Sequence, residues 1–480
     1  MADIGFCGDA YSVRSIYQNG QELINWYPQR DERKAQGERG ELTLYPTPGL
    51  SLRKQSATVS EVRGFCLLPN GLYFVSVIGN AFYSYDVAYN ETFRGNLLSS
   101  GGPVRITTNG LVVYITDGAN RYYWQVLGVN TLQVLPGTDG AFSGGSACDF
   151  LDGFIVYSQM GGTQWGATSN LSQFSPALSF ATKFSGADHI QTLFVDHREV
   201  YLLGELSTEA WVDVGSFPFP FQIIPGTNTQ HGCAAPNSVY RMGDSFAYLA
   251  KDNRGSSVVV QMVGYQAKRI STFAVENDLV GQTVSDAIGM TYQLGGHEIY
   301  VLTFPTADRT WCYDVATGMW HKWLAVDSFN VFHRHRANCM LNFNGEIIVG
   351  DYANGAIYAL DQLNYTDNGN EIRRVRRCPH LTAELKRVQY GELQIQFQPG
   401  VGLSVGQGSN PQVMLRWSDN GGSTWSTEHW TEIGAIGQYA NRARWTQLGM
   451  ARDRIFEVAI SDPVNAVIVS ANLVATPCDS

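Results

Sequence analysis

The sequence predicts an all-β protein built around a β-propeller of six or seven blades. Three observations carry this prediction: the composition, a turn-and-strand unit that recurs at blade-sized intervals, and a different strand pattern near the C-terminus. The 480 residues include 50 glycines and 12% aromatic residues, against only 16% charged residues. Because glycine favours turns and aromatic residues favour half-buried strands, this composition argues against a helical bundle and against a disordered chain.

The first 55 residues lie outside the repeat, and we expect them to form an extended N-terminal arm. Two apolar patches, one containing Trp26 and Tyr27 and the other Pro48, flank a charge-rich stretch at residues 30–41. Aromatic residues anchor interfaces, and prolines lower the entropy lost on docking. Trp26, Tyr27 and Pro48 are therefore candidate interface residues that dock on the body of the protein or on a neighbouring chain, with the charged stretch exposed.

Residues 56–375 are expected to form the propeller. Propeller blades are four-stranded sheets that repeat about every 40–50 residues. In most units a second strand carries an aromatic residue and a closing aspartate, as in Tyr85-Asp86 and Tyr313-Asp314. Ring closure commonly takes one strand from elsewhere in the chain, so seven visible units leave six or seven blades open. The turns that precede the apolar strands start near Pro69, Thr108, Leu151, Asp196, Met242, Leu294 and Phe343.

Residues 376–480 break the period and are expected to form a separate C-terminal β-sandwich or barrel. Alternating apolar residues mark its strands near residues 393–397, 414–416, 442–444, 456–460 and 467–469. Five strands over about 100 residues are enough for a compact β-domain.

A single hairpin motif in this domain resembles an Asp-box turn. Its residues are Ser418, Asp419, Gly421, Gly422 and Trp425, with the Ser–Asp spacing shortened by one. We expect the Asp419 carboxylate to accept backbone N–H groups inside the turn, the glycines to adopt positive φ, and Trp425 to pack beneath. The motif is known from sialidases, where it is structural and recurs on several blades, so its single occurrence here indicates a turn.

No pattern of residues marks a catalytic, metal or cofactor site. Spacing picks out no pair of carboxylates of the kind that glycosidases use, and the nucleophile elbow, zinc-peptidase and phosphate-loop motifs are absent. His333 and His335 would share one face of a strand, which makes a metal pair conceivable, but the sequence offers no third ligand. We therefore predict a protein that is not an enzyme, with no cofactor and no metal.

The charge pattern limits the partners. The net charge of −10 argues against tight, nonspecific DNA binding, which depends on Lys and Arg neutralising phosphates. A basic cluster of Arg373, Arg374, Arg376 and Arg377 stands at the junction of the two predicted domains, and contact with DNA phosphates, contact with an acidic partner and a solvated linker all remain open. With no apolar run near the roughly 18 residues of a membrane helix and no secretory signal, we expect synthesis in the cytosol and no membrane insertion.

Two passages resemble a known family. The first runs from Gln21 through Trp26 to Leu50; the second runs from Leu415 through the hairpin to Arg452, Arg454 and beyond. Together they are similar to the packaged-DNA stabilisation proteins of short-tailed bacteriophages, also called tail accessory or nozzle proteins. Arg452 and Arg454 are therefore added to the candidate interface residues.

The resemblance implies a virion protein that is assembled in the host cytoplasm into a ring, a hexamer, beneath the portal and its adaptor. Such a ring extends the DNA channel and helps to retain the packaged genome. The implied partners are other copies of the chain, the tail adaptor, a needle or plug, and tailspike or fibre proteins, while double-stranded DNA passes without tight binding. A glycan-binding propeller that recognises a receptor is the alternative, and a sialidase-like hydrolase is a third reading.

Deletion of residues 1–50 is expected to impair either folding or incorporation into a tail, because the apolar patches are too hydrophobic for a solvated tail. The measurement is the occupancy of the truncated chain on particles that carry portal and adaptor. A truncated chain that folds and loads at wild-type occupancy would refute the docking of this segment.

Overall fold

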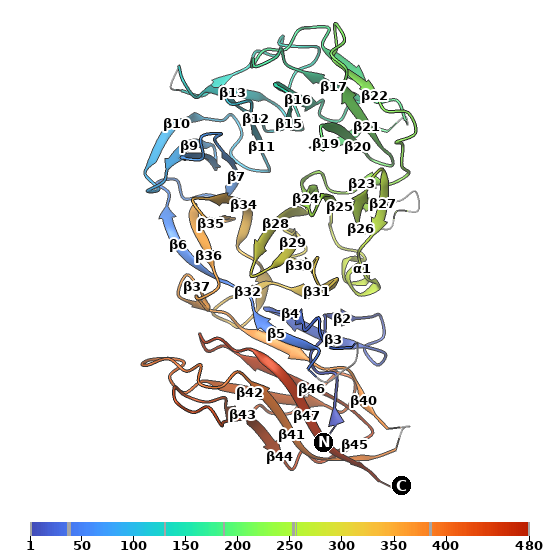
Figure 1. Cartoon of the computed structure of the whole chain (residues 1–480), viewed down its shortest axis with the longest axis vertical. Coiled ribbons are helices and arrows are strands. Elements are labelled where there is room, and N and C mark those ends of the chain that lie inside the picture. Colours follow the sequence, from blue (N-terminus) through green and yellow to red (C-terminus); the bar gives the residue numbers. More distant parts are fainter. Residues whose placement is uncertain are drawn as a thin grey trace.

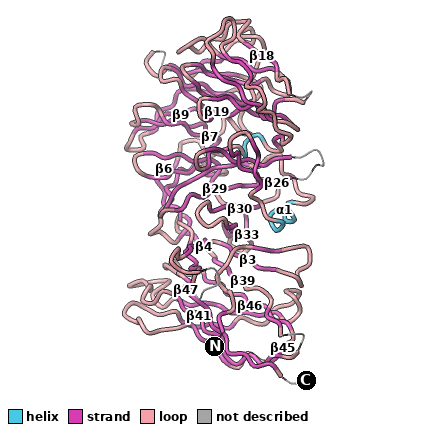
Figure 2. Tube along the Cα trace, turned by 45° about the vertical axis from the view of Figure 1, so that its right-hand side comes forward, coloured by secondary structure: helices cyan, strands magenta, loops and turns pink. Residues whose placement is uncertain are grey.

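The computed structural model describes residues 2–35, 40–128, 131–185, 188–251, 255, 257–383 and 386–478. They form an elongated molecule with a propeller at one end and a β-sandwich at the other, and both chain termini lie at the sandwich end (Figures 1 and 2). The described helices are α1 (Phe273–Leu279) and the short 3₁₀ helix η1 (Pro236–Ser238). The predicted all-β architecture, with a propeller followed by a C-terminal β-domain, is confirmed.

The described strands form seven blades, and their innermost strands circle a common centre (Figure 1). In chain order the blades consist of β7 (Val62–Leu67), β8 (Tyr73–Ile78), β9 (Ala81–Asp86) and β10 (Glu91–Asn96); β11 (Arg105–Thr108), β12 (Val112–Thr116), β13 (Arg121–Gln125) and β14 (Gln133–Val134); β15 (Ala147–Leu151), β16 (Phe154–Ser158), β17 (Gln164–Ala167) and β18 (Phe180–Thr182); β19 (Ile190–Asp196), β20 (Glu199–Gly204), β21 (Thr208–Asp213) and β22 (Phe221–Ile223); β23 (Gly232–Cys233), β24 (Tyr240–Met242), β25 (Ser245–Lys251), β26 (Ser257–Val263) and β27 (Gln266–Arg269); β28 (Ile288–Leu294), β29 (His297–Phe304), β30 (Arg309–Asp314) and β31 (Met319–Lys322); and β34 (Ala337–Phe343), β35 (Glu346–Asp351), β36 (Ala356–Asp361) and β6 (Gly49–Gln55).

The repeated turns of the sequence are the links between the first and second strands of the blades. Asn344 and Gly345 in the last of these turns have φ of 50° and 77°, which suits a tight hairpin between antiparallel strands. The strands with an aromatic residue and a closing aspartate, such as β9 and β30, are the third strands. The period in the sequence therefore corresponds to one blade.

The ring is closed by a strand from the N-terminal segment. β6 pairs antiparallel with β36, with Leu50 opposite Leu360, and becomes the outermost strand of the seventh blade. Gly49 lies so close to the following loop that a Cβ there would be 2.5 Å from the carbonyl oxygens of Asn364 and Thr366. The last blade therefore depends on residues that precede the first blade in sequence.

The sandwich consists of two facing sheets whose side chains form one core, with Leu393, Ile395, Leu415, Val458 and Leu473 all buried. One sheet contains β4 (Trp26–Arg30), β5 (Leu42–Pro46), β47 (Ile468–Pro477), β41 (Val388–Phe397) and β44 (Ala443–Thr446), with β1 (Ala2–Asp3) and β45 (Met450–Ala451) beside them. The other contains β3 (Gly20–Ile24), β39 (Arg374–Arg377), β46 (Asp453–Ile460), β42 (Gln412–Ser418) and β43 (His429–Glu432), with β2 (Tyr11–Ser12) and β40 (Leu381–Thr382). The short strands β32 (Leu324–Val326), β33 (Phe332–Arg334), β37 (Thr366–Asp367) and β38 (Asn370–Glu371) lie between the domains.

The first 55 residues, expected to form an arm, supply strands to both domains. Trp26 is fully buried, and its indole Nε1 donates to the Ala466 carbonyl oxygen at 2.8 Å. The charge-rich stretch begins at an exposed turn, but Glu41 is buried and pairs with Arg30 at 3.0 Å. Residues 36–39 of this stretch lie outside the described part of the chain. The segment thus docks on the body of its own chain.

Strand β3 joins the two domains into one continuous sheet. It pairs with β39 of the sandwich on one side and with β31 of the sixth blade on the other, so that one sheet of eleven strands passes through the waist. We call this junction the seam, defined by β31, β3 and β39. A hydrogen-bonded sheet resists bending at its joints, so the seam fixes the sandwich relative to the propeller.

Asn25 completes the seam where β3 ends. Its side chain donates to the carbonyl oxygens of Leu324 at 2.9 Å and Arg373 at 2.7 Å, and accepts from the Leu324 N–H at 2.8 Å. Its backbone carbonyl accepts from Thr47. The residue is fully buried with φ of 58°, a left-handed conformation that asparagine tolerates better than most residues.

Asn25→Ala is expected to lower the free energy of unfolding by about 3 kcal/mol or more, because buried partners on Leu324 and Arg373 lose their hydrogen bonds. Asn25→Gly relieves the left-handed backbone and should be less destabilising than alanine by about 1–2 kcal/mol. Chemical denaturation measures both. Asn368→Ala is the matched control, because Asn368 is exposed with φ of 50°, and a cost equal to that of Asn25→Ala would refute the role of the side chain.

Candidate interaction surface

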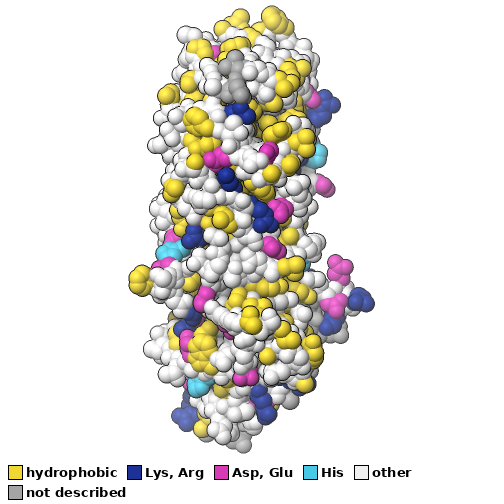
Figure 3. All heavy atoms as spheres, turned by 90° about the vertical axis from the view of Figure 1, so that its left-hand side faces the viewer, with side chains coloured by type: hydrophobic (Ala, Val, Ile, Leu, Met, Phe, Trp, Pro, Cys, Tyr) yellow, Lys and Arg dark blue, Asp and Glu magenta, His cyan; other side chains and the backbone are white. Residues whose placement is uncertain are grey.

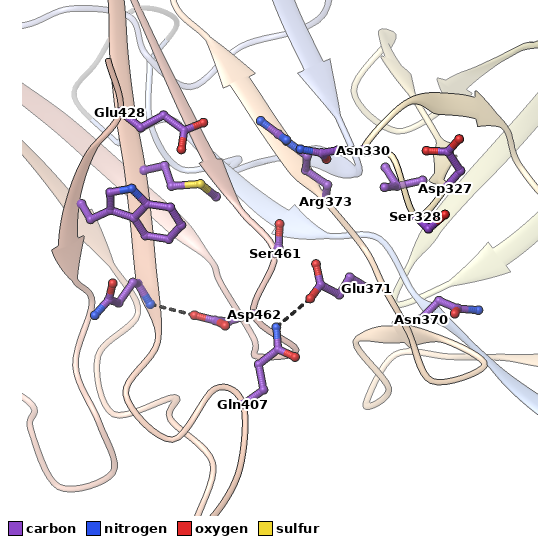
Figure 4. A pocket seen from close by; sticks show the side chains of 14 residues that line it. Asp327, Ser328, Asn330, Asn370, Glu371, Arg373, Gln407, Glu428, Ser461 and Asp462 are labelled. Atoms are coloured by element: carbon purple, nitrogen blue, oxygen red, sulfur yellow. Dashed lines mark hydrogen bonds between the residues drawn. The ribbon is translucent and has the colours of Figure 1, made fainter. Parts of the chain in front are cut away.

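A hollow of about 670 Å³ opens at the waist between the propeller and the sandwich (Figure 4). Loop residues 326–330 line it from the propeller side, and Trp430 and Asp462 line it from the sandwich side. A second hollow of about 360 Å³ lies over the seam, and Arg373 lines both. We call the two together the waist groove. In Figure 4 Arg373 reaches between Glu428 of the sandwich and Asn330 of the propeller.

The floor of the groove is apolar. Ile24, Val375, Met414 and Ala459 come from neighbouring strands of the continuous sheet and form a small cluster of their own, with Phe332 of β33 packed against it. Because side chains alternate between the faces of a strand, this outer face is separate from the sandwich core on the inner face. Trp430 is 56% exposed on the sandwich wall, which leaves a large aromatic surface without cover in the monomer.

A network of charges orders one end of the floor. The carboxylate of Glu457, whose side chain is 2% exposed, pairs with Arg377 at 2.8 Å and also with Arg416. The Trp425 ring lies between the two guanidinium groups, with ring centroid distances of 4.9 Å and 4.7 Å. On the other side of the seam Lys322 pairs with Glu22 at 2.9 Å. These pairs hold the strands of the seam in register.

The walls of the larger hollow carry mainly acidic groups. Backbone N–H groups of Val331 and Phe329 donate to Asp327 and lower the pKa of its carboxyl, so the loop is held around a charged Asp327. Gln412 N–H donates to Asp462 at 2.8 Å, and Gln407 donates to Glu371 at 3.0 Å (Figure 4). A partner with basic or hydrogen-bond-donating groups suits these walls.

The arginine cluster predicted from the sequence is divided between the two faces of β39. Arg374 and Arg376 are fully buried, while Arg373 and Arg377 line the waist groove. The prediction of a solvated linker is therefore wrong, and DNA phosphates cannot reach Arg374 or Arg376. Burial lowers the pKa of Arg374 to about 10 and raises the pKa of nearby Asp367 to about 7.

Arg376 ties the N-terminal segment to the sandwich. Its Nε donates to the carbonyl oxygen of Phe6 at 2.5 Å, its Nη1 to that of Asp9 at 2.9 Å, and its Nη2 to the side chain of Gln21 at 2.7 Å. Five donors in a planar fork allow arginine to satisfy several carbonyl groups at once. The buried charge thus acts as a cross-link within the chain.

The hairpin motif is a structural turn, but the expected role of Asp419 is wrong. Asn420 accepts the Thr424 N–H at 2.9 Å, and Ser418 Oγ accepts the Gly422 N–H at 2.8 Å. Asn420 therefore occupies the position that aspartate holds in an Asp-box, which restores the usual spacing. Asp419 instead forms a two-pronged pair with Arg454, at 2.6 Å and 2.7 Å. Gly421 and Gly422 have positive φ as expected.

The remaining predicted residues are placed as follows. Arg454 is 2% exposed and stacks over Tyr390, whereas Arg452 is exposed. Tyr27 stacks on Tyr45, and burial raises the pKa of its hydroxyl to about 12. Pro48 is buried. All these contacts except those of Arg452 are made inside the chain, so apolar character in this segment indicated a fold contact as readily as a contact between chains.

The two histidines do not converge. His335 is buried and stacks on Trp323 with ring centroids 3.7 Å apart. His333 contacts Asp308 at 2.6 Å, and this hydrogen bond raises the pKa of His333. Among the described residues no group of three His, Cys, Asp or Glu side chains could hold a metal ion. Neither described helix is long and apolar enough to cross a membrane.

The sequence gave no signal for the groove residues Phe332, Met414 and Trp430. They belong to three different segments, and only the sheet order brings them to one face. The seam, the sandwich and the seven blades together define an all-β structural protein of two domains in one rigid body.

Family models identify which one. A model described as "Bacteriophage P22 Gp10, beta-propeller" matches residues 30–365, and a model described as "Bacteriophage P22 Gp10, beta-sandwich" matches residues 373–475. The chain belongs to the bacteriophage P22 Gp10 family and is a structural protein of the phage tail, hence of the virion. The family resemblance noted in the sequence is confirmed.

Solved structures that resemble the chain are propellers of distant sequence. They include the WD40 propeller domain of Doa1 (11% identity, 65% of this chain and 97% of that chain, TM-score 0.40) and a streptogramin B lyase (10% identity, 66% and 98%, TM-score 0.42). U3-55K is similar as well (9% identity, 65% and 99%, TM-score 0.41). The search among curated proteins found no match.

Asp419→Ala is expected to lower the free energy of unfolding by about 1.5–3 kcal/mol, because the buried guanidinium of Arg454 loses its charged partner. Asn420→Ala, which removes neutral hydrogen bonds at an exposed turn, should cost about 0.5–1.5 kcal/mol. Asp419→Asn keeps the shape without the charge and should fall between them. Thermal melting gives the order, and a larger loss for Asn420→Ala would refute the assignment.

Proposed function

We propose that the chain is the repeating subunit of a ring, a hexamer, that extends the DNA channel below the portal and adaptor of a short phage tail and helps to retain the packaged genome. The observation that carries the proposal is the seam, which makes propeller and sandwich one elongated rigid body within a family of phage tail proteins. A ring under internal pressure needs subunits that do not bend at a hinge.

The charge of the chain supports passage of DNA. The net charge is −10, and the most prominent basic cluster of the sequence is half buried. Because affinity for the DNA backbone comes from Lys and Arg at phosphates, such a surface lets DNA slide without gripping it.

The waist groove supports contact with a neighbouring subunit. Its apolar floor, the exposed Trp430 and the loop tip residue Phe329, which is 85% exposed, are the kind of anchors that protein interfaces use. Further apolar side chains are spread over the propeller and gather low on one side of the molecule, whereas charged ones are scattered there (Figure 3). Heterologous contacts of this type close into a ring when each copy is rotated by a fixed angle.

Imaging of assembled particles by electron cryomicroscopy tests the function, with a ring of this chain on the tail axis as the expected result. Phe329→Asp should melt as the wild type does yet lower ring occupancy at least several-fold, since a charge at an interface core is costly. Phe217→Asp is the matched control, because Phe217 is 97% exposed on a propeller loop far from the waist. Density away from the tail axis would refute the function, and normal loading of Phe329→Asp would refute the waist as the contact.

A further inference from the structure

A cavity of about 600 Å³ lies at the mouth of the propeller channel, where the inner strands of several blades begin. β7, β11, β24, β28 and β34 contribute to its walls, together with η1. Its apolar side is formed by Phe65, Val104, Ile106, Met290 and Met340. This volume falls in the range of small-molecule sites, which are mostly apolar with a few placed polar groups.

Three arginines line the cavity, but only two have guanidinium groups with unused donors. Arg63 gives its donors to the loop that precedes β11, through the carbonyl oxygens of Gly79, Ser99, Gly101 and Gly102 and the hydroxyl of Ser99, and is 4% exposed. Its role is to hold that loop.

Arg105 is different. Within the described part of the chain its guanidinium makes a single hydrogen bond, from Nη2 to the Pro236 carbonyl oxygen at 2.8 Å. Burial lowers the pKa of Arg105, and Asp149, which opposes this shift, is already bonded to the N–H groups of Val195 and Phe150. The charge of Arg105 therefore faces the cavity with most of its donors unpaired.

Tyr240 and Asp286 add two further unused groups. The Tyr240 hydroxyl makes no hydrogen bond to any described residue, and its electrostatic interaction with Arg105 places it beside the guanidinium. Asp286 accepts the Thr306 N–H through Oδ2 at 2.7 Å, while its Oδ1 is buried without a partner among the described residues. Buried polar atoms are nearly always paired, so an acceptor left open beside a cavity indicates a missing donor.

The wall that carries Pro236 is rigid. Ser238 of η1 donates to the Ala235 carbonyl oxygen at 2.7 Å and accepts the Leu249 N–H at 3.0 Å, and its own carbonyl accepts the Tyr300 hydroxyl at 2.6 Å. Gly289 of β28 lies so close that a Cβ there would be 2.2 Å from the Ser238 carbonyl oxygen. The position of Arg105 is thus set before any ligand arrives, which lowers the cost of binding.

We propose that this cavity binds a small hydroxylated carboxylate, of the sugar-acid type, with its carboxylate on Arg105 and Tyr240 and a hydroxyl donating to Asp286. Arginine and a phenol are suited to a carboxylate, and the unpaired acceptor of Asp286 requires a donor on the same molecule. The apolar wall accepts the C–H face of a sugar ring. The site is independent of the waist groove and does not need a ring to form.

Isothermal titration of the full-length chain with glucuronate tests the proposal, with glucose, hexanoate and inorganic phosphate as probes that lack the charge, the hydroxyls or the carbon frame. Glucuronate should bind at least about tenfold more tightly than each of them, since each lacks one set of hydrogen bonds. Failure of glucuronate and galacturonate to bind, or phosphate binding as tight as that of glucuronate, would overturn it.

Variants locate the site. Arg105→Gln should weaken glucuronate binding at least about tenfold, and Arg442→Gln, which changes an exposed arginine on the sandwich, should leave it unchanged. Tyr240→Phe removes a hydroxyl that has no partner in the fold, so a loss of affinity there cannot come from misfolding. Binding that survives both Arg105→Gln and Tyr240→Phe would show that glucuronate binds elsewhere.

Discussion

The structure depends on the hydrogen bonds of one buried asparagine at the waist. Asn25 contacts the chain at Leu324, which leaves the propeller, and at Arg373, which enters the sandwich, and its own backbone turns β3 into β4. Three segments separated by hundreds of residues are thereby held at one point. An amide is the side chain that suits this point, because it both donates and accepts without bringing a charge into the interior.

The waist also contains an unusual number of buried cations, and each has a distinct solution to the cost of desolvation. Arg376 satisfies backbone carbonyl groups of the N-terminal segment, whereas Arg454 is neutralised by Asp419. Arg377 shares Glu457 with Arg416. A buried ion pair adds little net stability, yet breaking one leaves a charge stranded, so these contacts favour the native arrangement over competing ones.

The sequence predicted the fold well because each blade repeats the same local signals, a turn with positive φ and an apolar strand, which act independently of distant residues. It predicted the sandwich strands for the same reason. The site was harder. Asp419 was assigned the role that Asn420 performs, because one position of register decides which side chain faces the turn. Phe332, Met414 and Trp430 became neighbours only through strand order, which no local pattern encodes.

The pairing of the first strands with the last has a consequence for synthesis. β6 needs β36, β3 needs β39, and β4 and β5 need β47, so the N-terminal strands wait for partners that leave the ribosome near the end of translation. Contacts of such long sequence separation form late and leave strand edges open in the meantime. A fragment cut short by premature termination has neither a closed propeller nor a seam, and the architecture itself thus restricts the tail to complete chains.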